Sequence, residues 1–380
     1  MKKSRTILSL LLILISAAYS NSFERQEEKV QLALDEMYNM NLDESNILFT
    51  EVLHNEPFHP LAPVGALATR WLINQEIQGF RKGNEQLLKE IDTTLIIYRD
   101  EIDKYPDNTD ILFYYGTAMG LKARIQLAEK DWLGVLLSGY KSMQYIKHSF
   151  RENPEMWDIY LPIGVFNYYV GVSSSYMKIA SWIMSESGSK DEGLQQMQIA
   201  EKHGNYSRYE ARNLLAFILL YMEEDYYGSL KYSSMMAEKF PDNPYHFFLA
   251  AEALIILHKY DRAKIYMEKH QTLIPELRGN TKNENILKTH LLKGTLALHS
   301  GDLITAEEEL RYTVDTYDLE LDWHIAYANM RLGNVYDLQG KRETAIECYK
   351  KAISSDNRTS AYKWAKKYVN TPYTGEGFHP

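Results

Sequence analysis

The chain has 380 residues, of which 45% are hydrophobic and 24% are charged, and its formal net charge is −9. This composition is ordinary for a folded, soluble protein. The negative charge, together with the lack of a basic stripe, argues against a nucleic-acid partner. The single cysteine, Cys348, excludes an internal disulfide and the common zinc-binding patterns, and we expect it to be a small buried side chain.

The first twenty residues have the three parts of a secretory signal peptide. Three of the first five residues are basic, an apolar run follows over residues 7–15, and Ala18 and Ser20 are small residues at the cleavage positions. We therefore predict a signal peptide over residues 1–20 and export to the periplasm or beyond, with association with the cell envelope as a further expectation. An uncleaved N-terminal anchor is the alternative, although the apolar run is short for a membrane span.

Apolar residues at helical spacing, separated by turn signals, continue through the rest of the chain. No segment shows the sustained alternation of a β-strand, so the predicted fold class is all-α: a solenoid of helical hairpins with an irregular, longer central unit. The predicted units are N-terminal repeats over 21–154, the central unit over 155–205, two repeats over 206–277, a polar loop over 278–286, further repeats and a capping helix over 287–370, and a flexible tail over 371–380.

The most regular of these repeats covers residues 326–359. Its small and apolar residues are Leu332, Gly333, Tyr336, Gly340, Ala345, Tyr349 and Ala352. Gly333 and Ala345 are small enough to let two helices cross, and Gly340 suits the left-handed residue that ends the first helix. This pattern resembles the tetratricopeptide repeat (TPR), in which about 34 residues form two antiparallel helices. The resemblance implies a solenoid, because one such hairpin cannot bury its own apolar face.

The central unit contains a long run without charged residues, from Ile159 to Met177. Pro162 is expected to open one helix, serines at 173–175 to cap a second, and Ser189 to cap a third. Two interpretations remain open. The helices form the buried centre of the superhelix, or they present an apolar surface or cavity to a ligand, a partner or a membrane surface.

The block over residues 164–204 resembles a group of bacterial secreted TPR proteins with no defined activity. More distantly, it resembles the eukaryotic tetratricopeptide-repeat-39, or inclusion-body-clearance, family. The residues that carry this resemblance are Lys178, Trp182, Gly188, Lys190, Glu192, Gly193 and Leu194. The resemblance implies a helical array with a non-catalytic scaffold role, and it transfers no catalytic residues.

The sequence offers no clear pattern for catalysis. The 11 histidines are scattered, and we find no phosphate-binding glycine loop and no nucleophile elbow. Carboxylate runs such as residues 307–309 fall on the polar face of an amphipathic helix. We therefore predict a protein that is not an enzyme and that has no cofactor and no metal ion. Acidic residues converging from distant repeats remain the alternative.

Recognition is the remaining chemistry. In TPR arrays the first helix of each unit lines the concave face, and this register, with the central unit, gives the expected partner-binding residues: Tyr168, Tyr169, Lys178, Leu214, Tyr221, Tyr245, Phe248, Tyr327 and Asn334. Tyr168 and Tyr169 point about 100° apart on a helix, so one is expected to pack in the core and the other to face a groove or cavity.

An apolar, aromatic concave face suits an extended or helical peptide held by apolar anchors. The leading prediction is therefore a non-catalytic protein-binding scaffold or adaptor of the cell envelope, with a protein or peptide partner of unknown identity. The alternative is a carrier of a small apolar, lipid or glycan ligand, held in a cavity of the central aromatic unit. The sequence does not indicate the oligomeric state.

Overall fold

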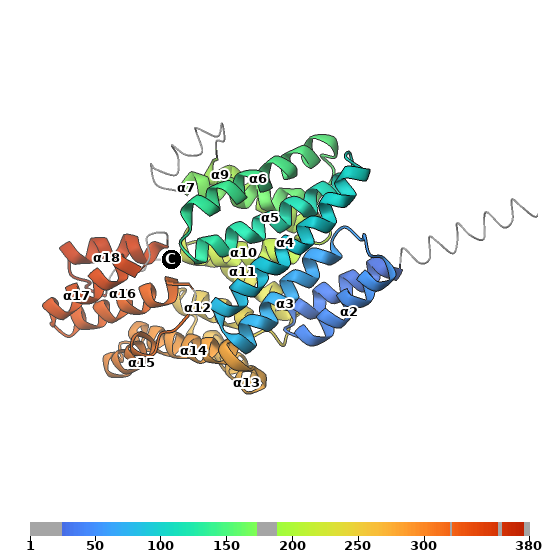
Figure 1. Ribbon diagram of the computed structural model, residues 1–380. Coiled ribbons are helices and arrows are strands. Elements are labelled where there is room, and N and C mark those ends of the chain that lie inside the picture. The colour runs from blue at the N-terminus through green and yellow to red at the C-terminus, as the bar shows by residue number, and fades with distance from the viewer. Residues whose placement is uncertain (1–24, 173–187, 320, 356–358, 376–380) are drawn as a thin grey trace, which may run out of the picture.

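The computed structural model describes residues 25–172, 188–319, 321–355 and 359–375. Every regular element within these ranges is a helix, which confirms the predicted all-α fold class (Figure 1). The predicted signal peptide, the middle helix of the central unit and Lys178 lie outside the described residues.

The N-terminal half consists of paired helices. A helix over residues 25–38 is followed by α2 (Leu42–Asn55), α3 (Ala62–Gln78), α4 (Phe80–Lys104), α5 (Thr109–Ala128) and α6 (Trp132–Glu152). The central unit contains the short 3-10 helix η1 (Trp157–Ile159), α7 (Tyr160–Val172) and α9 (Lys190–His203). As expected, the Ser189 side chain caps α9 by accepting a hydrogen bond from the backbone N–H of Glu192.

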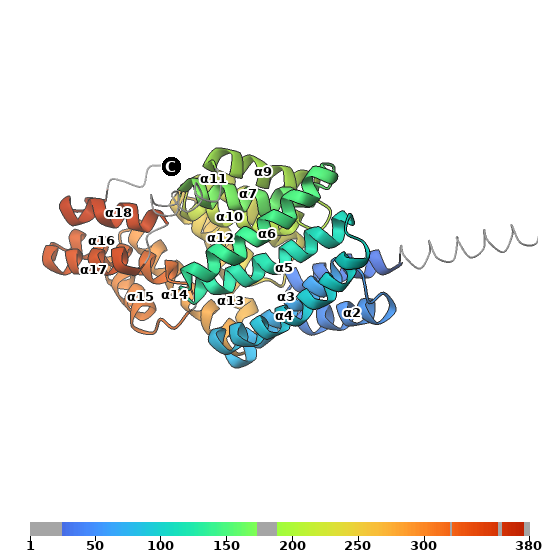
Figure 2. The ribbon, with the colours of Figure 1, turned by 45° about the horizontal axis from the view of Figure 1, so that its top comes forward.

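The C-terminal half continues the same hairpin pattern. Its helices are α10 (Arg208–Tyr221), α11 (Tyr226–Lys239), α12 (Pro244–Ile256), α13 (Tyr260–Leu273), the short η2 (Ile274–Glu276), α14 (Gly279–His299), α15 (Leu303–Asp315), α16 (Trp323–Leu338), α17 (Arg342–Ser355) and α18 (Ser360–Asn370). Figure 2 shows α16–α18 at one end of the molecule and α2–α4 at the other. The predicted capping helix corresponds to α18.

The hairpin of α16 and α17 forms as the sequence predicts. A Cβ atom placed on Gly333 would lie 2.5 Å from the ring of Tyr349, so the two helices cross too closely there for a side chain. Gly340 ends the hairpin's first helix with φ of 74°, a conformation that glycine adopts without strain.

The predicted polar loop over 278–286 is wrong, because residues from Gly279 onward are the first turns of α14. These turns pack on α3 from the N-terminal half. The Asn280 side chain donates to the carbonyl of Gln75 at 3.1 Å, and Arg278 forms an ion pair with Glu76 at 3.1 Å. The polar residues suggest a loop in the sequence, but tertiary contacts over a separation of about 200 residues hold them in a helix.

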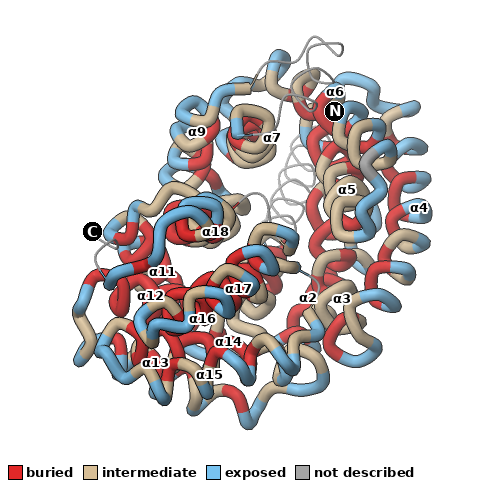
Figure 3. The backbone as a smooth tube through the Cα atoms, turned by 90° about the vertical axis from the view of Figure 1, so that its left-hand side faces the viewer, coloured by how far each residue is buried: buried red, intermediate tan, exposed pale blue. Residues whose placement is uncertain are grey.

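The array curls so that its N-terminal helices return to its middle helices (Figure 3). We call this junction the closure seam, and it joins residues 35–43 and 75–76 to residues 209–210, 239–243 and 278–280. At its centre the ring of Tyr38 contacts the rings of Tyr209 and Phe240, with centroids 5.8 and 5.6 Å apart. The seam therefore closes one turn of the superhelix into a ring.

Polar contacts flank the aromatic centre of the closure seam. Lys239 forms an ion pair with Asp35 at 2.8 Å, and the Asn39 side chain donates to Asp242 at 2.8 Å. The Asn243 side chain donates to the carbonyl of Tyr38 at 2.8 Å. Each contact joins residues that are more than 200 positions apart, so the ring is held by long-range tertiary structure.

Two hydrophobic cores support the ring, and α7 connects them. Ile163 of α7 belongs to the core of the N-terminal half, whereas Tyr168, one turn further on, belongs to the core of the C-terminal half. The central unit is thus the element through which the two halves are packed together.

We expect Gly333→Ala to destabilise the protein by about 1–3 kcal/mol, because the new methyl group would overlap the Tyr349 ring. Gly139→Ala is the matched control: Gly139 also lies within a helix, but a Cβ there meets nothing within 4 Å. The control should be neutral, or more stable by about 0.5–1 kcal/mol. Urea denaturation measures the free energy of unfolding of both variants. Equal effects of the two substitutions would contradict the close helix crossing at Gly333.

Candidate functional site

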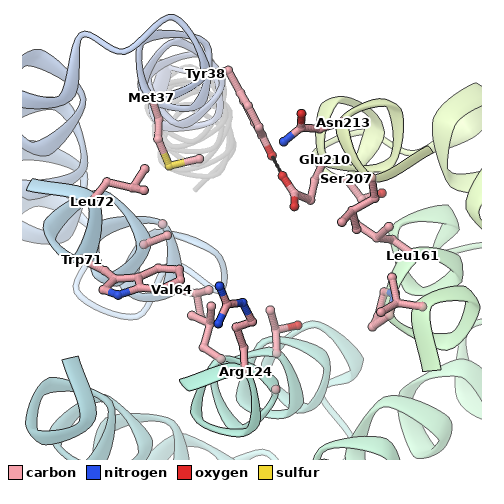
Figure 4. A pocket seen from close by; sticks show the side chains of 18 of the residues that line it. Met37, Tyr38, Val64, Trp71, Leu72, Arg124, Leu161, Ser207, Glu210 and Asn213 are labelled. Carbon is pink, nitrogen blue, oxygen red and sulfur yellow. Dashed lines mark hydrogen bonds between the residues drawn. The ribbon is translucent and has the colours of Figure 1, made fainter. Parts of the chain in front are cut away.

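The closed turn surrounds a cavity of about 850 Å³ that is partly open to solvent. Figure 4 shows it from close by, with side chains converging from the helix over residues 25–38 and from α3, α5, α7 and α10. Its apolar lining includes Leu34, Met37, Val64, Trp71, Leu72, Phe113, Leu121, Leu161, Val165, Phe166, Leu214 and Trp323. The lining residues thus come from both halves of the chain, and the closure seam brings them around one cavity.

Small residues on three helices border this space: Gly65 and Ala68 of α3, Gly120 of α5 and Gly139 of α6. Gly65 is small for a packing reason, because a Cβ there would lie 2.4 Å from the Phe49 ring. A Cβ on Gly139 would meet no atom within 4 Å, so its side of the wall is open. Protein interiors are otherwise close-packed, and a void of this size among apolar side chains is a feature of binding sites rather than of cores.

The uncharged helix α7 has two faces with different roles. Ile163 and Tyr168 are buried in the two cores. Leu161, Val165 and Phe166 border the cavity. Both interpretations of the uncharged run therefore apply: one face is core and the other is cavity wall.

Glu210 and Tyr38 place a polar group where the closure seam meets the cavity. The Glu210 carboxyl points toward Tyr38 (Figure 4), whose hydroxyl donates to it at 3.2 Å. Burial raises the pKa of the Glu210 carboxyl above its ordinary value, and hydrogen bonds from Tyr38 and Asn213 oppose this rise. The contact that closes the ring therefore contains a carboxyl that favours its neutral form.

A second polar group, Arg124 of α5, projects into the cavity (Figure 4). Its guanidinium lies over the ring of Trp71, 5.7 Å from the ring centroid. The Trp71 side chain is in turn held by a hydrogen bond from its indole N–H to Asn84 at 2.8 Å. This arrangement buries the flat face of the arginine against an aromatic wall.

The part of the cavity lining on α14 and α16 has its own polar group, which we call the polar end: Glu284, Asn285, Lys288 and His324. Lys288 is 4% exposed and forms an ion pair with Glu284 at 2.7 Å. His324 is also 4% exposed, and neither of its ring nitrogens has a hydrogen bond of normal geometry. Burial lowers the pKa of His324 well below its ordinary value, and nearby Lys288 lowers it further.

Two of the nine predicted partner-binding residues, Leu214 and Tyr245, line the cavity. Of the adjacent tyrosines, Tyr168 is fully buried and donates to Glu223 at 2.7 Å, which matches the expectation that one of them packs in the core. Tyr169 is half-buried against the core and against the Tyr168 ring, and it is not among the cavity-lining residues.

Tyr221, Phe248, Tyr327 and Asn334 were expected on an open concave face, but the structure buries all four. The Tyr327 hydroxyl donates to the carbonyl of Tyr221 at 3.1 Å, and Asn334 accepts a hydrogen bond from the Tyr349 hydroxyl at 3.0 Å. In this part of the chain α10, α12, α16 and α18 pack so closely that the positions expected to face a groove face other helices instead.

The cavity residues of the N-terminal half, among them Met37, Trp71 and Arg124, are not among the predicted partner-binding residues. The N-terminal repeats are too irregular for the TPR register to assign a concave face. One signal was present: α5 is apolar on every face over residues 111–121. A helix that packs only on its two hairpin neighbours does not need so broad an apolar surface.

The described residues contain no group of three or more His, Cys, Asp or Glu side chains placed to hold a metal ion. Among the described helices, none is long and apolar enough to cross a membrane.

Comparison with known protein families matches residues 326–359, the hairpin of α16 and α17, to the tetratricopeptide repeat. The chain contains a tetratricopeptide repeat. Repeats of this family generally act in protein binding and as non-catalytic scaffolds. No protein with a curated description matches the chain.

Solved structures with a similar fold include other helical-repeat proteins. Yeast Tom70 is 11% identical, with 90% of this chain and 87% of that chain covered and a TM-score of 0.40. The human IFIT1 dimer is 12% identical, with 91% and 86% covered and a TM-score of 0.44. A tetratricopeptide repeat protein from Parabacteroides merdae is 16% identical, with 92% and 100% covered and a TM-score of 0.30. At these values the likenesses carry no functional argument.

The raised pKa of Glu210 leads to a prediction about pH. Between the ordinary pKa of a glutamate and the raised folded value, the folded state binds more protons than the unfolded state, so this group lowers the stability as pH rises through that window. Glu210→Gln removes the titration while keeping an acceptor for Tyr38.

We therefore expect Glu210→Gln to gain stability relative to the unsubstituted protein as pH is raised from about 4 to neutrality. Urea denaturation of both proteins across this range measures the difference, and other titrating groups cancel in the comparison. Parallel stability curves for the two proteins would show that the Glu210 carboxyl is not buried in the closed ring.

Proposed function

We propose that this chain is a non-catalytic binding protein of the cell envelope that holds a small apolar ligand in the cavity of its closed ring. The observation that carries the proposal is the largely apolar cavity of about 850 Å³, which is partly open to solvent. Small-molecule sites are typically concave spaces of about 300–1,000 Å³ with mostly apolar walls and a few placed polar groups. This proposal takes the ligand-carrier alternative of the sequence analysis and assigns it to a wider cavity than the central unit alone.

The chemistry of the wall favours an apolar small molecule over a peptide. A peptide brings a backbone N–H and C=O at nearly every residue, and each one buried without a partner costs about 1–3 kcal/mol. The exposed surface of the wall is mostly apolar, and several of its polar groups bond to one another, such as Tyr38 with Glu210 and Lys288 with Glu284. A hydrocarbon chain or ring system has no polar groups that need hydrogen-bond partners in the cavity.

A protein partner on the outer surface is the second candidate. The tetratricopeptide repeat supports it, because its family generally acts in protein binding. The outer face of α6 adds a specific feature: Leu133, Leu137 and Tyr140 recur at helical spacing and are exposed. Cross-linking of the full chain in an envelope extract tests this candidate, and cross-links confined to other faces would count against α6.

The location in the cell envelope rests on the signal-peptide pattern of residues 1–20. Cleavage after Ser20 would give a mature N-terminus at Asn21. N-terminal sequencing of the native protein tests this step, and recovery of Met1 would reject cleavage.

The cavity should bind N-phenyl-1-naphthylamine, a neutral dye whose fluorescence rises in apolar surroundings. Ala68→Trp adds an indole to the cavity wall on α3, and we expect it to weaken dye binding by about tenfold or more, which corresponds to about 1.4 kcal/mol. Ile77→Trp is the matched control, because Ile77 lies on the same helix but is 67% exposed.

Fluorescence titration of the three proteins gives the dissociation constants, and thermal unfolding confirms that each variant is folded. Loss of dye binding only in Ala68→Trp would support the cavity as the site. No dye binding by the unsubstituted protein, or equal binding by all three proteins, would refute it.

A further inference from the structure

We infer that the ligand has a neutral hydroxyl head group, bound at the polar end of the cavity, and a hydrocarbon tail that lies along α3, α5 and α7. This inference rests on the proposed function and names the class of ligand: a long-chain alcohol or another lipid whose polar group both donates and accepts hydrogen bonds. The donors and acceptors of the polar end carry the argument.

The charges of the polar end already balance one another. The ammonium of Lys288 pairs with the Glu284 carboxylate at 2.7 Å. It also lies over the rings of Tyr245 and Phe248, 4.6 and 5.6 Å from their centroids. Lys288 therefore has a carboxylate and two aromatic faces as partners, and the site as a whole does not call for a charged ligand.

Two further side chains at the polar end are buried with hydrogen-bonding atoms unused. His324 stacks on Trp323 with ring centroids 3.4 Å apart. Neither of its ring nitrogens makes a hydrogen bond of normal geometry, although the backbone of Leu321 lies close enough to oppose the lowering of the His324 pKa. The Asn285 amide N–H donates to the carbonyl of Thr281 at 2.8 Å, which fixes the amide orientation and leaves its oxygen without a partner. Both residues line the cavity.

Unused polar atoms of this kind are rare in folded proteins and cost about 1–3 kcal/mol each, so they point to a partner that the cavity receives. His324 is neutral at pH 7, since its pKa is lowered, and a neutral imidazole offers one donor and one acceptor. The Asn285 oxygen offers a second acceptor. The polar end thus presents two acceptors and one donor.

This inventory discriminates between head groups. A carboxylate only accepts hydrogen bonds, so it could use the His324 donor but would face the Asn285 oxygen and the Glu284 carboxylate. A hydroxyl donates one hydrogen bond and accepts others, so it can satisfy His324 and Asn285 together. An ether accepts hydrogen bonds but cannot donate one. Comparing the ether with the alcohol therefore measures the contribution of the hydrogen bond that the ligand hydroxyl donates.

The apolar walls determine where the tail lies. From the polar end, the cavity continues between α3, α5 and α7, where Leu72, Leu121 and Val165 are among the lining residues. A hydrocarbon tail buried there gains roughly 0.8 kcal/mol for each CH₂ group removed from water. Head-group selectivity and tail affinity therefore arise from different parts of the cavity lining.

Displacement of N-phenyl-1-naphthylamine by three probes with the same tail tests the inference: 1-dodecanol, dodecanoate at pH 8 and dodecyl methyl ether. We expect 1-dodecanol to bind about tenfold more tightly than either of the others, the equivalent of one hydrogen bond of about 1.4 kcal/mol. His324→Phe should abolish this preference while retaining the dye. If His324→Phe does not fold, Asn285→Leu takes its place, since it removes the unpaired acceptor.

The outcomes separate the two proposals. A preference for the alcohol that disappears in the His324 or Asn285 variant supports the inference. Equal binding of the three probes, or a preference for dodecanoate, overturns the hydroxyl head group while dye binding upholds the cavity. A protein that binds neither the dye nor any dodecyl probe refutes the proposed function and the inference with it.

Discussion

The packing of Tyr38 against Tyr209 and Phe240 is the contact on which the rest of this structure depends. It brings the first described helix onto the middle of the chain and turns an open array of hairpins into a ring. The hydrogen bond from Tyr38 to Glu210 adds a polar element to the same contact. Without the Tyr38 packing, the two halves of the chain would not face each other across one cavity.

The closure seam and the C-terminal core differ in how firmly they are held. In the C-terminal core, Arg331 and Glu252 are almost completely buried, pair with each other, and are joined by Thr295, which accepts from Arg331 at 2.8 Å. Separating a buried pair of this kind is costly. The ion pairs that flank the aromatic centre of the seam, such as Lys239 with Asp35, are partly exposed and contribute roughly 0–1 kcal/mol each. The aromatic packing of Tyr38 therefore carries more of the seam's stability than these ion pairs do.

The local parts of this fold were predictable from the sequence, and the long-range parts were not. The contact of Gly333 with Tyr349 and the turn at Gly340 follow from spacing within one hairpin. The closure seam joins residues about 170–235 positions apart, such as Tyr38 with Glu210, and no periodic pattern records such a pairing. For the same reason the sequence predicts a loop where α14 begins, and it predicts a concave-face position for Phe248 and Tyr327, which the folded chain buries.

The closed ring is the central claim, and zero-length cross-linking tests it most directly. A carbodiimide joins a lysine to a carboxylate only when the two are in contact, as Lys239 and Asp35 are at 2.8 Å across the seam. Lys190 and Glu223, 2.6 Å apart and away from the seam, provide the internal control. The account expects both links in the peptide map of the monomeric protein in solution. A 190–223 link without a 35–239 link would mean that the ring is open and that the cavity does not exist as described.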